Sequence, residues 1–288
     1  MAMRERGLRE LGQAAVDPLA ERLQRAVVGA FEVGGAAGRR IRDVLHGTWL
    51  GHPLHPVLTD VPIGAWTVAA TLDLTGDGDA GRQRAADMAI GIGLIGAVGA
   101  AVTGVTDWQH TADDDRRVGL FHGLLNLSAA TLYTIALGLR MRGARSAGRT
   151  TAGLGFVVAV TAAYLGGHLV YRKRIGVDHA PRLEWNDFVA VLSEGELAES
   201  TPRRVEARGV RVVLIRRRDR IHALADTCAH LGGPLSEGQL DDVAIRCPWH
   251  GSRFALDDGR VLEGPSTFAQ PCFDVRVRDG RIEVRARR

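Results

Sequence analysis

The sequence predicts an α+β protein of two parts, an N-terminal all-α bundle of four transmembrane helices and a C-terminal all-β domain. Long runs without formal charge fill the first part, whereas short β-branched runs separated by turn signals follow about residue 186. A chain of 288 residues is long enough for two domains. The formal net charge of +4 is small and scattered, which argues against nucleic-acid binding.

Residues 1–45 predict an amphipathic N-terminal helix, because apolar side chains recur there every three or four positions. The recurring residues are Leu8, Leu11, Ala15, Leu19, Leu23, Val27 and Phe31. The stretch contains no early apolar run of the kind found in a signal peptide. A helix that packs on the rest of the chain and one that lies on a membrane surface are both compatible with this pattern.

Residues 46–175 predict a transmembrane domain, because a bilayer span needs about 20 apolar residues. The predicted spans are residues 57–74, 88–105, 118–139 and 151–171. The first is the weakest because it carries Asp60, Pro62 and Asp73. Three spans, or buried helices of a soluble protein, are the alternatives. Four spans place both ends of the domain on one side of the bilayer.

Six histidines fall on that same side, and ionisable residues at a membrane are candidates for function. They are His52, His55, His110, His122, His168 and His179. One hypothesis is that His122 and His168 bind a b-type haem or another metal between the third and fourth spans. His52 and His55 are an alternative pair, or line a quinone pocket. In the third interpretation these side chains only form hydrogen bonds with loop carbonyls.

The C-terminal part reads as a linker over residues 176–185 followed by a domain over residues 186–288. Residues 210–215 form a run typical of a strand. Asp279 and Gly280 lie between two further apolar runs, which is a strong hairpin signal.

Two cysteines and two histidines lie in this domain as C-x-H, sixteen residues, and C-x-x-H. They are Cys228, His230, Cys247 and His250. Zinc takes four such ligands, but its motifs usually pair two cysteines in each loop. One Cys and one His from each loop suit a two-iron cluster in which one iron takes both thiolates and the other both imidazoles.

This motif and its flanking glycines and prolines resemble the Rieske family over about residues 186–288. The resemblance implies a [2Fe–2S] cluster, with Cys228 and Cys247 on the inner iron and His230 and His250 on the outer, exposed iron.

The chain departs from the Rieske proteins of respiratory complexes, which carry two further cysteines and a tyrosine near these loops. Gly233 and Trp249 stand at the cysteine positions, and Phe254 replaces the tyrosine. The resemblance is therefore to the ferredoxin type that serves oxygenases, with a lower potential. Cys272 has no ligand partner nearby and suits a buried apolar position.

The membrane part also carries a resemblance. The stretch WLGHPLHPVLTDVPIGAWTVAATLDL, which begins at Trp49, is similar to a bacterial membrane family of unknown function. That family is marked by an H-P-x-H-P opening and a P-I-G in its first span. The match covers about residues 45–175 and implies no activity.

These observations predict a membrane-tethered electron carrier that exchanges single electrons with a redox protein partner, an oxygenase or the quinone pool. A non-redox or oxidant-sensing membrane module is the alternative. About 40 residues follow the second loop, too few for the catalytic iron domain of an oxygenase. The distribution of Arg and Lys predicts a multi-pass protein of the bacterial inner membrane with its Rieske domain in the cytoplasm.

Overall fold

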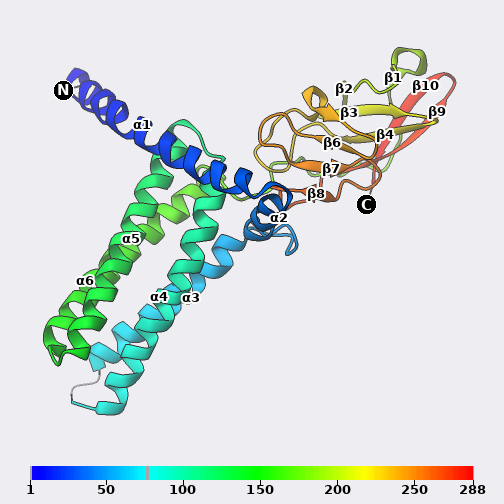
Figure 1. Ribbon diagram of the computed structural model, residues 1–288. Helices are drawn as coiled ribbons and strands as arrows, with labels where there is room; N and C mark the ends of the chain where they lie inside the picture. Colours follow the sequence, from blue (N-terminus) through cyan, green and yellow to red (C-terminus); the bar gives the residue numbers. More distant parts are fainter. Residues whose placement is uncertain (1, 76–77, 288) are drawn as a thin grey trace. The chain divides into compact units, whose positions relative to one another are not determined.

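The computed structural model describes residues 2–75 and 78–287, with side chains from residue 16 onward. The chain divides into two compact units (Figure 1). The first unit combines the residues up to Leu45 with Leu54–Ile175 and is helical, whereas the second combines His46–Pro53 with the residues from Gly176 onward. Apart from His46–Pro53, the second unit is built mainly of strands and loops.

Six α-helices lie in the described residues. They are α1 (Ala2–Val33), α2 (Gly35–His46), α3 (Leu54–Thr75), α4 (Ala80–Trp108), α5 (Asp113–Met141) and α6 (Arg145–Tyr171). The structure divides the helix predicted for residues 1–45 into α1 and α2. Gly35 has a φ of 53° at the break, a conformation that glycine adopts without strain. A Cβ on Gly34 would lie only 2.8 Å from Gly38 Cα, so this bend also requires a glycine there.

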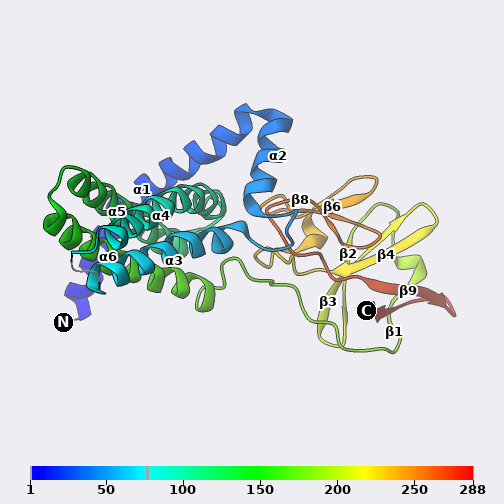
Figure 2. The same ribbon diagram turned by 90° about the horizontal axis from the view of Figure 1, so that it is seen from below.

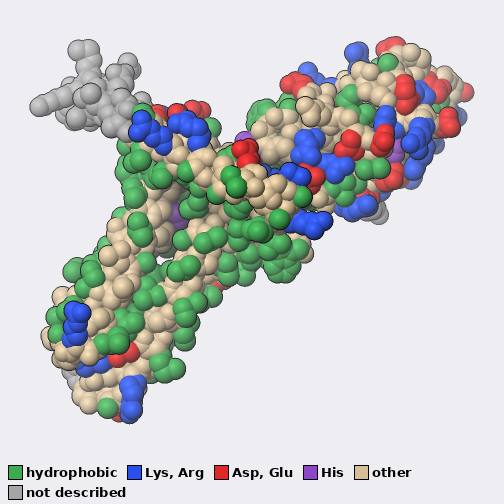
Figure 3. Space-filling model, viewed as in Figure 1, with side chains coloured by type: hydrophobic (Ala, Val, Ile, Leu, Met, Phe, Trp, Pro, Cys, Tyr) green, Lys and Arg blue, Asp and Glu red, His purple; other side chains and the backbone are tan. Residues whose placement is uncertain are grey.

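The four helices α3 to α6 are each long and apolar enough to cross a membrane. The four spans predicted from the sequence lie within these helices, which extend beyond them at one or both ends. Large apolar side chains remain exposed along the helices. Examples are Ile92, Ile95, Val98, Leu127, Ile135, Leu154 and Val157. Figure 3 shows that hydrophobic side chains cover the middle of this unit, while charged side chains gather towards its ends. This distribution is typical of a lipid-facing surface.

The four helices form two hairpins, α3 with α4 and α5 with α6, and the second hairpin repeats the first. Gly91–Gly104 of α4 and Gly153–Gly166 of α6 share the pattern G-x-G-x-x-x-A-V-x-A-A-x-x-G, 62 positions apart. The sequences of α3 and α5 also align with each other at an offset of 67 positions, which makes His55 equivalent to His122. In the pattern shared by α4 and α6, six of the seven shared positions are Gly or Ala, small residues that let helices approach closely in a membrane.

Equivalent residues of α3 and α5 meet each other at the interface between the two hairpins. Three such pairs are His55 with His122, Trp66 with Tyr133, and Asp73 with Arg140. The Trp66 and Tyr133 rings are stacked with their centroids 4.2 Å apart. When a residue contacts the equivalent residue of the other hairpin, both lie next to a pseudo-two-fold axis that relates the hairpins. Because three such pairs follow one another along α3 and α5, this axis runs along the bundle. Repeats of this kind often carry their functional sites at the interface between them.

Glycines on α4 and α6 make room for the stacked pair. A Cβ on Gly93 would lie 2.2 Å from Trp66 Nε1, and one on Gly155 would lie 3.3 Å from a Tyr133 ring carbon. Gly93 and Gly155 are themselves equivalent in the repeat. The repeat in the sequence therefore corresponds to the same glycine–ring contact in both hairpins.

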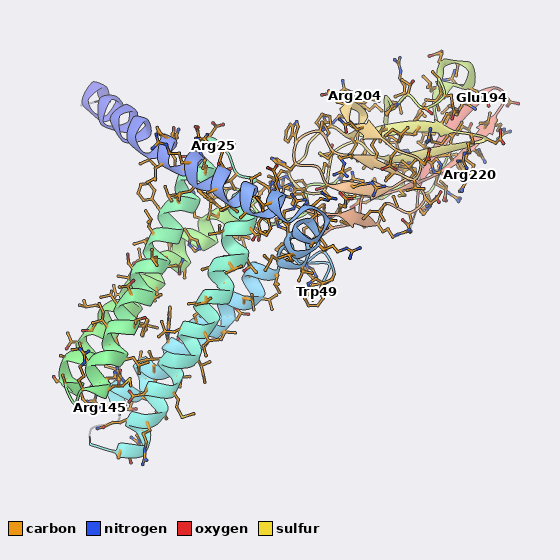
Figure 4. All side chains as sticks on the ribbon, viewed as in Figure 1. Arg25, Trp49, Arg145, Glu194, Arg204 and Arg220 are labelled. Atoms are coloured by element: carbon orange, nitrogen blue, oxygen red, sulfur yellow. The ribbon has the colours of Figure 1, made fainter. Side chains whose placement is uncertain are left out.

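A buried ion-pair network closes one end of the bundle. The Arg140 side chain has no exposed surface, and its guanidinium donates to the carboxylates of Asp73 and Asp87. Arg145, which Figure 4 shows at the end of the α5–α6 hairpin, donates to both oxygens of Asp87 at 3.0 Å. Arg149 approaches Asp73 at 3.7 Å. Each buried charge therefore has a partner of opposite sign.

The second unit contains three antiparallel sheets, seen from another side in Figure 2. Their strands are β1 (Val189–Ser193), β2 (Arg203–Ala207), β3 (Val210–Arg217), β4 (Arg220–Ala225), β5 (Gln239–Leu240), β6 (Ala244–Arg246), β7 (Arg253–Ala255), β8 (Val261–Glu263), β9 (Phe273–Arg278) and β10 (Arg281–Ala286). The sheet orders are β1-β10-β9, β2-β3-β4 and β5-β6-β7-β8. The hairpin predicted at Asp279 and Gly280 joins β9 to β10.

Candidate metal centre

Two loops with the same backbone pattern carry the C-x-H and C-x-x-H motifs. The first loop follows β4, and the second joins β6 to β7. The carbonyl of Cys228 accepts from Gly232 N at 2.9 Å, and that of Cys247 accepts from Gly251 N at 3.1 Å. Both glycines have a φ of 80°, which explains why glycine occupies the same place in each loop.

The hydrogen bonds of the cysteine N–H groups repeat as well. Cys228 N donates to Gly233 O at 2.9 Å, and Cys247 N donates to Ser252 O at 2.8 Å. Each cysteine is thus fixed by two backbone hydrogen bonds within its own loop. The two loops therefore present their side chains from matched, rigid turns.

The two thiols lie side by side in the interior of the second unit. Cys228 and Cys247 are 1% and 3% exposed, and their side chains are hydrogen-bonded to each other. This bond and burial raise the pKa of Cys228, whereas the same bond lowers the pKa of Cys247 to about 7. Backbone N–H groups also point at the sulfur atoms. They are those of His230 and Leu231 for Cys228, and those of Trp249 and His250 for Cys247. Such donors stabilise thiolates.

The two imidazoles form a second pair, nearer the surface. The ring centroids of His230 and His250 are 5.0 Å apart with an interplanar angle of 85°. Burial lowers the pKa of His230 well below its usual value and also lowers that of His250. Both rings are therefore neutral at pH 7, the form in which imidazole binds metals. Trp249, which is 58% exposed, lies edge-on to His250.

The space around these four side chains fits a compact metal cluster. A Cβ on Gly233 would lie 3.0 Å from Cys247 Sγ and 2.9 Å from the Trp249 ring. A larger residue at Gly233 would therefore fill the space next to the sulfur. Two neighbouring thiols and two neighbouring imidazoles match the donor set of a Rieske centre. Over residues 16–75 and 78–287, no three His, Cys, Asp or Glu side chains are arranged to hold one metal ion.

Gln270 supports the first loop and was not predicted from the sequence. Its Oε1 accepts from Ala229 N at 2.9 Å, and its Nε2 donates to Ala225 O and Thr227 O at 2.6 and 2.7 Å. The side chain is 1% exposed, so these bonds lie in the interior. No local sequence pattern marks a single glutamine in a loop as a structural residue.

Histidines outside the motif also belong to the second unit. His46 is 1% exposed, and positive charge on His46 or His179 would further lower the pKa of His230. His179 N donates to Ala229 O at 3.0 Å, next to the cluster motif. His52 packs edge-on to Phe268 with their ring centroids 6.0 Å apart. The sequence singled out His52 and His179 but missed His46.

The remaining predicted site residues lie in the first unit. The structure places His122 beside His55, with their ring centroids 6.3 Å apart. The sequence instead predicted that His122 pairs with His168. The hydrogen bond from Lys173 lowers the pKa of the Asp114 carboxyl, and His168 lies close enough to make a smaller contribution. The repeat at 67 positions would have identified the pair of His55 and His122 from the sequence.

Comparisons with known proteins identify both parts of the chain. A family described as Rieske [2Fe-2S] domain matches residues 187–274, and one described as predicted membrane protein (DUF2231) matches residues 51–179. Ferredoxin CarAc of Metapseudomonas resinovorans is 34% identical over 98 residues, which are 34% of this chain and 92% of the ferredoxin. The chain belongs to the Rieske [2Fe–2S] family through its C-terminal domain, which is fused to a predicted membrane protein domain. The Rieske domain implies a [2Fe–2S] cluster.

Two further relatives match the same part of the chain. The anthranilate 1,2-dioxygenase ferredoxin subunit of Burkholderia cepacia is 29% identical over 101 residues, 35% of this chain and 91% of the relative. Apoptosis-inducing factor 3 of Homo sapiens is 32% identical over 121 residues, 41% of this chain. The chain spans only 20% of the length of that relative. The two relatives named as ferredoxins, CarAc and the dioxygenase subunit, support a role in electron transfer.

Proposed function

We propose that this protein is a membrane-tethered Rieske-type electron carrier that passes single electrons to or from a redox protein partner. The pair of matched loops carries the proposal, because it brings two buried thiols and two half-buried imidazoles together at one site. Four apolar helices in the same chain support the tether. The cluster supplies one-electron chemistry when it is bound.

The ligands that we assign to the cluster are Cys228 and Cys247 for one iron and His230 and His250 for the other. The difference in burial supports this division, since the thiols are enclosed and the imidazoles lie nearer the surface. The exposed ring of Trp249 beside His250 offers an apolar contact at the same place. Electrons therefore enter and leave on the histidine side of the site.

An oxygenase component is the partner that the relatives favour, because one of them is named as the ferredoxin subunit of a dioxygenase. The membrane quinone pool is the second candidate, and the four apolar helices support it, since quinones reside in the bilayer. Both partners accept or donate single electrons. A module that senses oxidants is the remaining alternative.

A redox titration separates the carrier from the sensor. The purified full chain should contain two iron atoms of cluster per chain and undergo reversible one-electron reduction, with a Rieske-type paramagnetic signal in the reduced state. Phe254 lacks the hydroxyl of a tyrosine, so the midpoint potential should lie near the lower end of the Rieske range, about −150 mV. Irreversible loss of the cluster during one redox cycle would favour the sensor.

We further propose that the protein resides in the bacterial inner membrane with its Rieske domain in the cytoplasm. Nine Arg or Lys residues flank the helix ends on the side of the Rieske domain, and six flank the opposite ends. Positive residues favour the cytoplasmic side. A C-terminal green fluorescent protein should therefore fluoresce, and a C-terminal alkaline phosphatase should be inactive. The same fusions placed after residue 143 should give the opposite results. An active C-terminal phosphatase would contradict this orientation.

A further inference from the structure

Two histidines face each other inside the helical unit, at equivalent positions of the repeat. The rings of His55 on α3 and His122 on α5 have their centroids 6.3 Å apart and an interplanar angle of 88°. An ionisable side chain within an apolar bundle is costly, and two that meet on the axis of a repeat indicate a functional site.

Both rings are held in the same orientation by the helix that pairs with their own. His55 Nδ1 lies 2.8 Å from Ala100 O, and His122 Nδ1 lies 2.9 Å from Ala162 O. A carbonyl oxygen only accepts, so Nδ1 carries the hydrogen in each ring and Nε2 keeps its lone pair. Metal-binding histidines are commonly fixed in this way, with one nitrogen on a carbonyl and the other on the metal.

Glycines make room for each ring, again at equivalent positions. A Cβ on Gly104 would lie 2.8 Å from His55 Cε1, and one on Gly166 would lie 3.1 Å from His122 Cε1. The repeat therefore contains one histidine, one alanine carbonyl and one glycine at equivalent places in each hairpin. Close packing of the helices would explain the glycines, but it would not require a histidine in both hairpins.

One polar neighbour, Asn126, lies next to the ring of His122. Asn126 Nδ2 is 3.2 Å from His122 Nε2 and also donates to His122 O at 2.9 Å. The Asn126 side chain is one helical turn from His122 and lies at an exposed position, so it can turn away without leaving a cavity. The same Nδ2 also lies 3.4 Å from His122 Nδ1, so the amide faces both nitrogens of the ring.

We propose that His55 and His122 are the axial ligands of a haem bound between the two hairpins. A haem needs only two protein ligands, because its porphyrin supplies the remaining nitrogens. Zinc needs four ligands, and no group of three His, Cys, Asp or Glu side chains that could hold an ion occurs over residues 16–75 and 78–287. Filling both axial positions leaves no site for oxygen, so this haem carries electrons. The inference is independent of the function proposed for the Rieske domain.

The test is to purify the full chain in detergent from cells supplied with haem precursor and to measure pyridine haemochrome and total iron. We expect one haem and three iron atoms per chain, and loss of the haem in His55→Ala and in His122→Ala. The variant His168→Ala should keep it, which distinguishes this pair from the pair predicted by sequence. The Rieske cluster should remain in all three variants, because its ligands lie in the other unit.

A conservative substitution separates ligation from a role in packing. Methionine also binds haem iron and raises the potential, so His122→Met should retain the haem with a shifted visible spectrum and a higher midpoint potential. A wild-type chain with no haem, or with stoichiometric quinone, copper or zinc in its place, would overturn the proposal. Retention of haem by both alanine variants, or an unchanged spectrum in His122→Met, would overturn it as well.

Discussion

Replacing Cys247 by Ala should remove the iron–sulfur cluster completely. The proposed inner iron has two thiolate ligands, so loss of one leaves it with a single protein ligand in a buried site. The same outcome is expected for Cys228→Ala, because its loop has the same backbone hydrogen bonds. The measurement is iron content together with the visible circular dichroism of the purified full chain, and the expected signal is none.

Cys272 provides the matched control for this experiment. It is the third cysteine of the chain, is also buried, and burial raises the pKa of its thiol to about 11. Its Sγ lies 3.5 Å from Gln270 O and takes no part in the two loops. Cys272→Ala should keep the full cluster and cost about 1 kcal/mol of stability. A cluster retained in Cys247→Ala, or lost in Cys272→Ala, would contradict the assigned ligands.

Replacing Arg140 by Ala should destabilise the helical bundle by about 3–5 kcal/mol, since it leaves buried carboxylates without their central partner. Asp73 would keep only the distant Arg149, at 3.7 Å. The free energy of unfolding can be measured by denaturant titration in mixed micelles, followed by helical circular dichroism. Arg142, which is exposed just beyond the end of α5, is the control, and Arg142→Ala should change stability by less than about 0.5 kcal/mol.

A double substitution tests whether the cost arises from an unpaired charge. Replacing both Asp73 and Arg140 by Leu removes the pair together, while Asp87 keeps its bonds to Arg145. A buried ion pair replaced by apolar residues often leaves stability unchanged. The double variant should therefore recover most of the stability that Arg140→Ala loses. A double variant as unstable as the single one would indicate that the network acts through shape and not through charge.

The class of each part could be predicted from the sequence because the relevant signals are local. Uncharged runs of the length of a bilayer indicated three of the four apolar helices, and a weaker run with two aspartates indicated the first. The spacing of Cys228, His230, Cys247 and His250 indicated the Rieske family. The turn at Asp279 and its glycine joins two strands as predicted. In each case the residues that carry the signal lie in one short continuous segment of the sequence.

Features that depend on contacts between distant segments were not predicted. Gln270 holds a loop about forty positions away, and Arg140 meets Asp73 across two helices. The division of the N-terminal helix at Gly35 was also missed, although the apolar period ends at Phe31, before the glycines. His122 was paired with His168 by assuming that neighbouring helices share their histidines, whereas the repeat brings His55 to that place.

The relation between the two hairpins has a consequence for how this bundle could have arisen. In a symmetric dimer of one hairpin, any residue on the two-fold axis meets an identical copy of itself. Two imidazoles tolerate that arrangement, as His55 and His122 show, but two arginines or two aspartates would repel each other in a buried site. When both hairpins belong to one chain, equivalent positions need not hold the same residue, because a substitution in one hairpin leaves the other unchanged. The pair of Asp73 and Arg140 is therefore a contact on the axis that a dimer of identical hairpins could not form.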